Sequence, residues 1–182
     1  MKQTTKILVL LLLVLALCVP MLGCSKLLDL RLFSPFYDTS SSEAESMLES
    51  LVAAIESRDA DAVKSLFSKQ VQETAPNLSD SISALFQFYQ GEMQSYERYG
   101  PGTSAMKEGQ IHKEEIFCSF DVTTTTGIYR IAFLWCTVDT EFPDKVGLVS
   151  VYIIRAEDSD PDRAYWGIDN KNDIWNPGIH IE

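Results

Sequence analysis

The sequence predicts an α+β fold in which helices come first and a meandering sheet follows. Up to about residue 90, apolar side chains recur at the spacing of one helix face. Beyond that point they alternate or form short apolar runs, as strands do, and short turn signals separate the runs. Because helices and strands are segregated along the chain, an antiparallel sheet with helices packed on it is expected, and not an α/β fold.

Three amphipathic segments predict helices. The first is the strongest, and its apolar stripe consists of Ala44, Met47, Leu48, Leu51, Val52 and Ile55. Residues 38–42, which are rich in Ser, supply N-cap chemistry just ahead of it. A second, shorter helix begins after Asp59 or Asp61. A third runs from about Ser79 to Tyr89 and stops at Gly91.

Residues 93–154 predict the sheet. Residues 93–99 form a first candidate strand, and the next strand places Ile116, Cys118, Phe120 and Val122 on one face. A hairpin turn at residues 125–127 returns the chain into residues 128–137, which are apolar on both faces and so belong in the middle of the sheet. A turn at residues 143–145 leads into another inner strand, 146–154, and residues 165–168 are candidates for a short last strand.

The first 23 residues have the parts of a secretory signal. Lys2 and Lys6 precede an uncharged run, residues 7–19, that is rich in Leu and Val, and Gly23 is a small residue directly before Cys24. The run is too short for a comfortable transmembrane helix, which needs about 20 apolar residues. The sequence therefore predicts that residues 1–23 are a signal peptide that is removed.

The residues that end this signal resemble a bacterial lipobox. Lipoprotein processing joins a diacylglyceryl group to a Cys thiol and cleaves just before that Cys. The usual motif has Leu where Met21 stands and a small residue where Leu22 stands. Cys18 is a poor alternative because the bulky Leu17 precedes it. We therefore expect acyl chains such as palmitate on Cys24, where the alternative is a plain secretory signal with an incidental Cys.

This interpretation divides the chain into three parts: the signal peptide at 1–23, a lipidated tether at 24–41 and one α+β domain at 42–182. Two or three acyl chains hold a protein stably on a bilayer. The expected location is therefore the cell membrane, with the domain on the extracytoplasmic face.

The charge balance argues against nucleic acid as a partner. The chain has 15 basic and 26 acidic residues and a formal net charge of −11. Loss of residues 1–23 removes Lys2 and Lys6 and no acidic residue, so 13 basic residues remain and the charge becomes −13. Nucleic-acid binding needs clustered Lys and Arg, and no cluster is present. The expected partners are the membrane, through the lipid, and an unidentified protein or small molecule.

Several short sequences resemble a known family. Residues 56–68 (ESRDADAVKSLFS), after an amphipathic helix, resemble the opening of nuclear transport factor 2-like domains. More specifically, CTVDT at 136–140 and PDKVGL at 143–148 resemble the lipoproteins grouped as "domain of unknown function 5104", and FYQGE at 88–92 and WNPGI at 175–179 fit as well. The resemblance covers most of residues 38–182. It implies a cone in which helices pack across a curved antiparallel sheet, and the location of a lipoprotein. The family has no assigned activity, so no catalytic residue is implied, and related cones often form homodimers through the open face of the sheet.

The candidate ligand-binding residues are Asp139, Trp135 and Tyr152. Asp139 lies inside one of the family-like sequences, and the two aromatic side chains could line a cavity at the mouth of the cone. The alternative is that the aromatic side chains are ordinary core. Asp121 and Arg130 flank the hairpin, so they could pair across the two strands as an ion pair at the rim.

The sequence allows two interpretations of the two cysteines in the domain. Cys118 and Cys136 face each other across the predicted hairpin, so either a disulfide or two buried thiols is consistent with the sequence. His112 and His180 lie in patterns that do not predict burial. The sequence has no metal-ligand spacing, nucleophile motif or phosphate loop, so no catalytic residue, metal or cofactor is expected.

The sequence thus favours a non-catalytic module that binds a ligand or a protein. The alternative is a small enzyme of the cone fold, a hydrolase or an isomerase, with Asp139 as the first candidate for a buried carboxylate. A third hypothesis is a lipoprotein that simply occupies a partner's surface. An open pocket that holds a buried Asp beside Tyr or Trp would favour the enzyme, whereas a packed interior would not.

Overall fold

The computed structural model describes the backbone of residues 35–99, 104–107, 113–158 and 176–181. It divides the chain into two compact units, residues 1–37 and residues 38–182. The expected α+β domain, residues 42–182, lies within the second unit. The architecture described below is that of this second unit.

Four helices occupy the first part of the domain: α2 (Pro35–Glu56), α3 (Ala60–Leu66), α4 (Lys69–Thr74) and α5 (Leu78–Phe88). The predicted cap at residues 38–42 is wrong, because α2 is already helical there. It begins at Pro35, a residue whose fixed φ suits a first helical position. The second predicted helix is confirmed as α3, and its N-cap is Asp59, whose Oδ1 accepts a 2.9 Å hydrogen bond from the N–H of Ala62.

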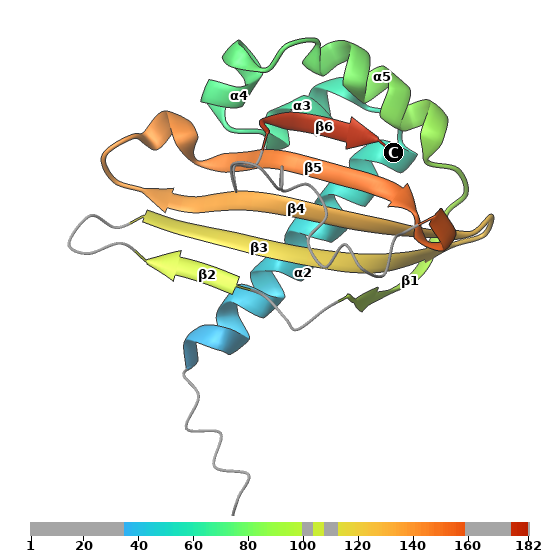
Figure 1. Ribbon diagram of the computed structural model, residues 1–182, viewed down its shortest axis with the longest axis horizontal. Coiled ribbons are helices and arrows are strands. Elements are labelled where there is room, and N and C mark those ends of the chain that lie inside the picture. Colours follow the sequence, from blue (N-terminus) through green and yellow to red (C-terminus); the bar gives the residue numbers. More distant parts are fainter. Residues whose placement is uncertain (1–34, 100–103, 108–112, 159–175, 182) are drawn as a thin grey trace, which may run out of the picture. The chain divides into compact units, whose positions relative to one another are not determined.

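The sheet has six strands in the described residues: β1 (Met93–Arg98), β2 (Ser104–Lys107), β3 (Lys113–Thr124), β4 (Ile128–Asp139), β5 (Gly147–Arg155) and β6 (Gly178–Ile181). The strand order is β1-β3-β4-β5-β6, and β2 also pairs with β3 (Figure 1). The predicted central position of residues 128–137 is confirmed, since β4 lies in the middle of this order.

The prediction of a wholly antiparallel sheet is wrong at one edge. Strand β3 pairs antiparallel with β1, β2 and β4, and β4 pairs antiparallel with β5. Strand β6 runs parallel to β5, with Val151 opposite Ile179. The sheet is therefore mixed. A long stretch of chain separates the end of β5 at Arg155 from the start of β6 at Gly178, and parallel neighbours need such a long connection. The predicted strand at 165–168 and the turn at 100–102 lie outside the described residues.

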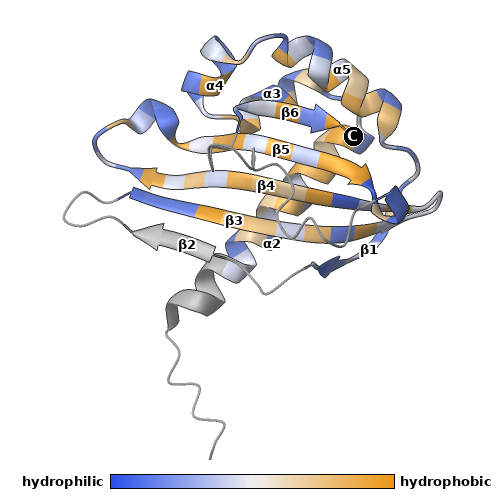
Figure 2. Ribbon diagram, viewed as in Figure 1, coloured by the Kyte–Doolittle hydropathy of each residue, from blue (hydrophilic) through white to orange (hydrophobic). Residues whose placement is uncertain are grey.

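The helices cover one face of the sheet, and the core lies between them (Figures 1 and 2). The inward residues of β3 are Ile116, Cys118, Phe120 and Val122, as predicted, and those of β4 include Tyr129, Ile131 and Phe133. They pack with the apolar stripe of α2, in which Leu48, Leu51 and Val52 are fully buried. This face alone therefore accounts for most of the buried apolar surface in the described residues.

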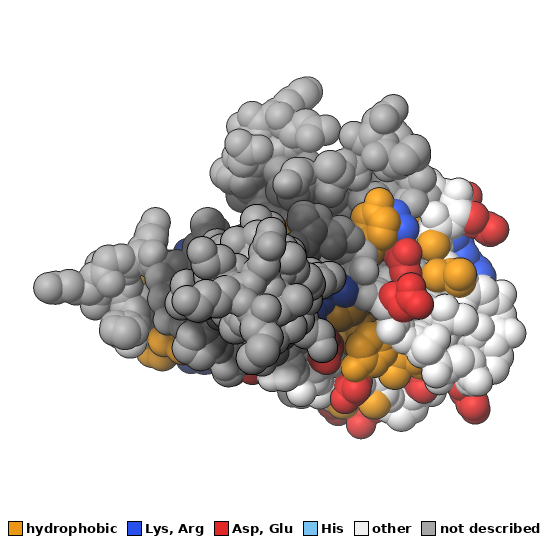
Figure 3. Space-filling view, turned by 90° about the horizontal axis from the view of Figure 1, so that it is seen from below, with side chains coloured by type: hydrophobic (Ala, Val, Ile, Leu, Met, Phe, Trp, Pro, Cys, Tyr) orange, Lys and Arg blue, Asp and Glu red, His pale blue; other side chains and the backbone are white. Residues whose placement is uncertain are grey.

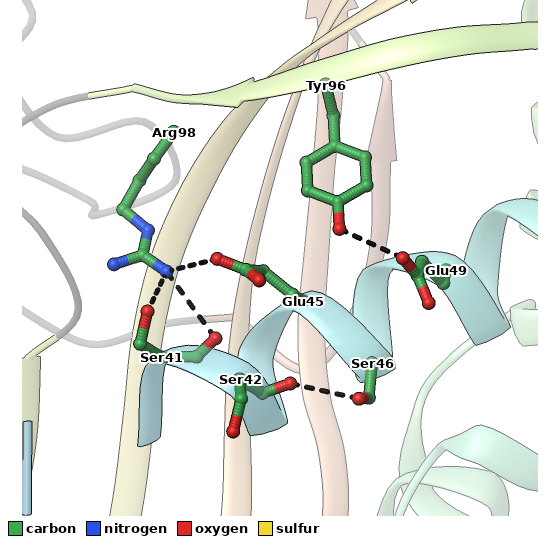
Figure 4. A network of polar contacts seen from close by, with 7 residues as sticks. All are labelled: Ser41, Ser42, Glu45, Ser46, Glu49, Tyr96 and Arg98. Carbon is green, nitrogen blue, oxygen red and sulfur yellow. Dashed lines mark hydrogen bonds and ion pairs between the residues drawn. The ribbon is translucent and has the colours of Figure 1, made fainter. Parts of the chain in front are cut away.

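A polar seam joins α2 to the edge strand β1 (Figure 4). Arg98 donates to Glu45 at 2.9 Å and also bonds to Ser41, and the hydroxyl of Tyr96 donates to Glu49 at 2.9 Å. Nearer the end of the helix, Glu56 accepts from the N–H of Met93 at 2.6 Å. The acidic flank of α2 is thereby fixed against β1, which sets the orientation of the helix across the sheet.

The packing of Phe120 yields a first prediction. Its ring is fully buried, 5.8 Å from the ring of Tyr96 and 6.1 Å from that of Phe133. Replacing Phe120 with Ala leaves a cavity, so the free energy of unfolding should fall by about 3–5 kcal/mol in urea denaturation followed by circular dichroism. The matched control, Phe142→Ala, removes a ring that is 48% exposed and should change it by less than about 0.5 kcal/mol. Equal losses in the two variants would contradict this description of the core.

Candidate functional site

A shallow hollow lies between the first half of α2 and β4. It has a volume of about 270 Å³ and is lined by Ser42, Glu43, Ser46, Met47, Ser50 and Trp135. All but Trp135 come from the helix. The hollow thus lies between the first half of α2 and the inner face of β4, in the half of β4 that leads to the turn at residues 143–145.

The helix places three serines on its solvent-exposed side, next to the polar seam. Ser42, Ser46 and Ser50 recur every fourth residue, so they share one side of α2. Figure 4 draws Ser42 and Ser46 beside Glu45 and Glu49, which belong to the adjacent acidic flank. The Ser46 hydroxyl donates to the Ser42 carbonyl at 2.9 Å, and the Ser50 hydroxyl donates to the Ser46 carbonyl at 2.8 Å. Each of these two hydroxyls has therefore given its proton to the helix backbone and offers only lone pairs to the hollow.

Trp135 provides the wall from the sheet. It lies opposite Ile116 on β3 and Leu148 on β5, and its half-buried side chain packs against the main core cluster. Met47 is also half-buried and packs against the same cluster. The apolar lining of the hollow is therefore continuous with the core, and its other lining residues are three serines and Glu43.

The structure does not bring the three candidate ligand-binding residues together. Trp135 faces the helices, but Tyr152 lies on the other face of the sheet, where its ring stacks on His180 at 4.4 Å between centroids. Asp139 ends β4, and its Oδ1 accepts hydrogen bonds from the N–H groups of Glu141 (3.1 Å) and Phe142 (2.7 Å). Asp139 is therefore a buried turn-forming residue outside the hollow, and the three predicted residues do not form one site.

The cross-strand ion pair is confirmed. Asp121 lies directly opposite Arg130, and the carboxylate accepts from Nε at 2.8 Å and from Nη2 at 3.0 Å. The guanidinium also lies over the ring of Tyr99, 3.2 Å from its centroid. This bidentate pair lies on the face of the sheet away from the helices, so it stabilises the hairpin and takes no part in the hollow.

The predicted placement of Cys118 and Cys136 is wrong. Both thiols are buried and free. Cys118 lies opposite Phe133 and faces the helices, whereas Cys136 lies opposite Glu115 on the other face. The hairpin is centred between Thr125 and Thr126, not at Gly127, and a shift by an odd number of residues turns a side chain to the opposite face. A disulfide between these residues is therefore not formed.

The described residues supply few groups for other chemistry. No set of three or more His, Cys, Asp or Glu side chains within them is placed to hold a metal ion. His180 donates from Nε2 to the carbonyl of Asn176 at 2.9 Å, while His112 lies outside the described residues. None of the helices in the described ranges has the length and apolarity needed to cross a membrane.

A family model now identifies the chain. The model described as Domain of unknown function (DUF5104) matches residues 50–156, more than half of the sequence. The chain belongs to the DUF5104 family. No curated protein matches it. The matched residues run from α2 through β5, so the DUF5104 domain includes Ser50 and Trp135 of the hollow.

Most residues of the hollow were missed by the sequence prediction. Of the six, Trp135 is predicted as a ligand-binding residue, Met47 as part of the helix stripe and Ser42 as part of the N-cap segment, whereas Glu43, Ser46 and Ser50 are assigned no role. A signal was present, because serines at every fourth position of an amphipathic helix mark a flank that is neither core nor charged. The sequence does not show which strand lies beside this flank, so the hollow could not be predicted from the serines alone.

The cysteines yield a prediction on pH. Burial raises the pKa of Cys136 to about 11, with the negative charges of Glu115 and Asp139 adding to the effect. The unfolded thiol ionises near 9.0, so the unfolded state loses its proton first. The free energy of unfolding should therefore be unaffected by this group below pH 9 and should fall as the pH rises from 9 toward 11.

Urea titrations at several pH values, on the wild type and on Cys136→Ala, test this prediction. The decline above pH 9 should be smaller in Cys136→Ala than in the wild type, because the variant has lost the linked ionisation. Identical slopes in the two proteins would contradict it, and so would an intact mass that shows Cys118 and Cys136 oxidised to a disulfide.

Proposed function

We propose that the protein is a lipid-anchored lipoprotein on the extracytoplasmic face of the cell membrane, whose domain binds a ligand or partner without catalysis. In this proposal Cys24 carries the acyl chains, the residues between Cys24 and helix α2 form the tether, and the hollow beside Trp135 makes the contact. The arrangement of helices on one face of a long central hairpin supports a nuclear transport factor 2-like cone, with the hollow at its open end.

The observation that carries the binding function is the contrast between the interior and its open end. Inside, Leu51, Ile131 and Ile153 are at most 1% exposed, so the DUF5104 domain fills this part of the interior with its own side chains. At the open end, Trp135 and Met47 stay half-buried beside a polar rim. A half-exposed aromatic wall with a few convergent polar groups is typical of a ligand site.

The chemistry of the rim supports a site that binds without reacting. A serine nucleophile needs a base that takes its proton, but Ser46 and Ser50 donate theirs to helix carbonyls. The buried carboxylate of the described residues, Asp139, is occupied by two backbone N–H groups. The hydrolase or isomerase alternative has no observation in its favour within the described part of the chain.

The anchor is tested by metabolic labelling with a palmitate analogue. The wild type should be labelled and should sediment with the membrane fraction, and Cys24→Ser should lose the label, because the thiol that accepts the lipid is gone. Cys18→Ser is the matched control and should behave as the wild type does. A label that persists in Cys24→Ser would contradict lipidation at this residue.

The binding site is tested by native mass spectrometry of the full-length chain purified in mild detergent from the host envelope. A small molecule or partner should co-purify with the wild type and with Phe142→Leu, an exposed aromatic outside the hollow. Trp135→Leu keeps an apolar side chain but removes the aromatic wall, so it should retain at least about tenfold less of that molecule. Full retention by Trp135→Leu would exclude the hollow as the site, and absence of any bound species from the wild type would contradict the proposal.

A further inference from the structure

We infer that the hollow takes an organic cation, specifically a primary alkylammonium group on a short apolar body. The inference rests on the proposed function, because it names the ligand class of the same site. Three features of the described residues support it: the hydrogen-bonding character of the rim, the composition of the wall, and the sign of the charge.

The rim of the hollow offers acceptors. The hydroxyl protons of Ser46 and Ser50 are committed to the carbonyls of Ser42 and Ser46, so the two oxygens present lone pairs only. The Glu43 carboxylate can only accept. A ligand that satisfies this rim must therefore bring its own donors, and an ammonium group brings three N–H donors and no lone pair.

The wall of the hollow suits a positive charge carried on an apolar chain. Trp135 is the aromatic residue whose ring face attracts a cation most strongly, and it is half-buried here. Met47 supplies a polarizable thioether that adapts to a flexible aliphatic chain. An ammonium head between Trp135 and Glu43, with its carbon chain along Met47, would contact each kind of group that the hollow provides.

The site and its surroundings carry negative charge, which attracts a cation. Glu43 has no ion pair with any described residue, whereas its neighbour Glu45 is bound to Arg98. The chain carries a formal charge of −11, and acidic side chains lie among the hydrophobic ones on the described part of the surface in Figure 3. Such a surface attracts cations to the hollow and repels carboxylates and phosphates.

The test uses the full-length chain and NMR titrations that follow the indole N–H of Trp135 and the methyl group of Met47. The probes are butylammonium, its neutral counterpart butan-1-ol, and tetramethylammonium, a cation without N–H donors. Butylammonium should shift both signals to saturation. Butan-1-ol should bind at least about tenfold more weakly, because it lacks the charge, and tetramethylammonium should fall between them, because it lacks the donors.

Two variants separate the site from general charge effects. Glu43→Gln keeps the size of the side chain but removes its charge, so it should weaken butylammonium binding at least about fivefold. The Trp135 indole signal of this variant should then saturate at a correspondingly higher butylammonium concentration. Glu141→Gln removes one negative charge from an exposed residue outside the hollow and should leave binding unchanged. Equal losses in both variants would overturn the role of Glu43.

The outcomes also distinguish this inference from the proposed function. If butan-1-ol and butylammonium bind equally well, the hollow is a ligand site but the cation inference is wrong. If butylammonium shifts signals elsewhere but neither Trp135 nor Met47, the inference is wrong as well. In both cases the co-purification experiment with Trp135→Leu still decides whether the hollow binds the natural ligand or partner.

Discussion

The burial of the inner faces of β3 and β4 against α2 is the constraint on which the rest of this structure depends. Residues 128–137 are apolar on both faces, so this segment must lie inside the sheet with the first helix across it. Full burial of Phe120, Ile131 and Phe133 fills the space beneath the middle of α2. Because the interior is occupied there, accessible space is found in the hollow beside Trp135, which is only half-buried.

Three sides of helix α2 have different roles in the structure. Its apolar stripe forms the core, and its acidic flank is fixed to β1 through Arg98 and Tyr96. Its serine flank lines the hollow. The seam holds the helix along its acidic flank, while the neighbouring serine flank stays exposed. Partly buried, charge-assisted hydrogen bonds such as that of Arg98 to Glu45 are worth more than exposed ion pairs, which supports a positional role.

The sequence predicts the parts of this fold that burial dictates. The stripe of α2, the Asp59 cap of α3 and the central position of β4 all follow from apolar spacing and capping chemistry, and so does the Asp121 and Arg130 pair. Helix α4 was missed because its six residues bury only Val71. Strand β6 was missed because a four-residue segment that pairs in parallel depends on a distant partner, which no local pattern reveals.

The site was less predictable than the fold, for a similar reason. Trp135 could be proposed from its type, but its neighbours in the hollow come from a helix about 90 residues earlier in the chain. Asp139 and Tyr152 were proposed from the same strands, yet the turn after β4 uses the first and the opposite face of the sheet buries the second. The error on Cys118 and Cys136 arose from the hairpin register, which depends on turn geometry that the sequence TTTTG leaves open.

The central claim is that the interior is closed and that accessible space lies at the open end beside Trp135. Methyl NMR spectra of the full-length chain under xenon pressure test it most directly, because xenon enters apolar cavities that water leaves empty. The account predicts shifts for the Met47 methyl group and none for the methyl groups of Leu51, Ile131 and Ile153. Saturable shifts of those three interior residues would contradict the account, since they would reveal a cavity within the core.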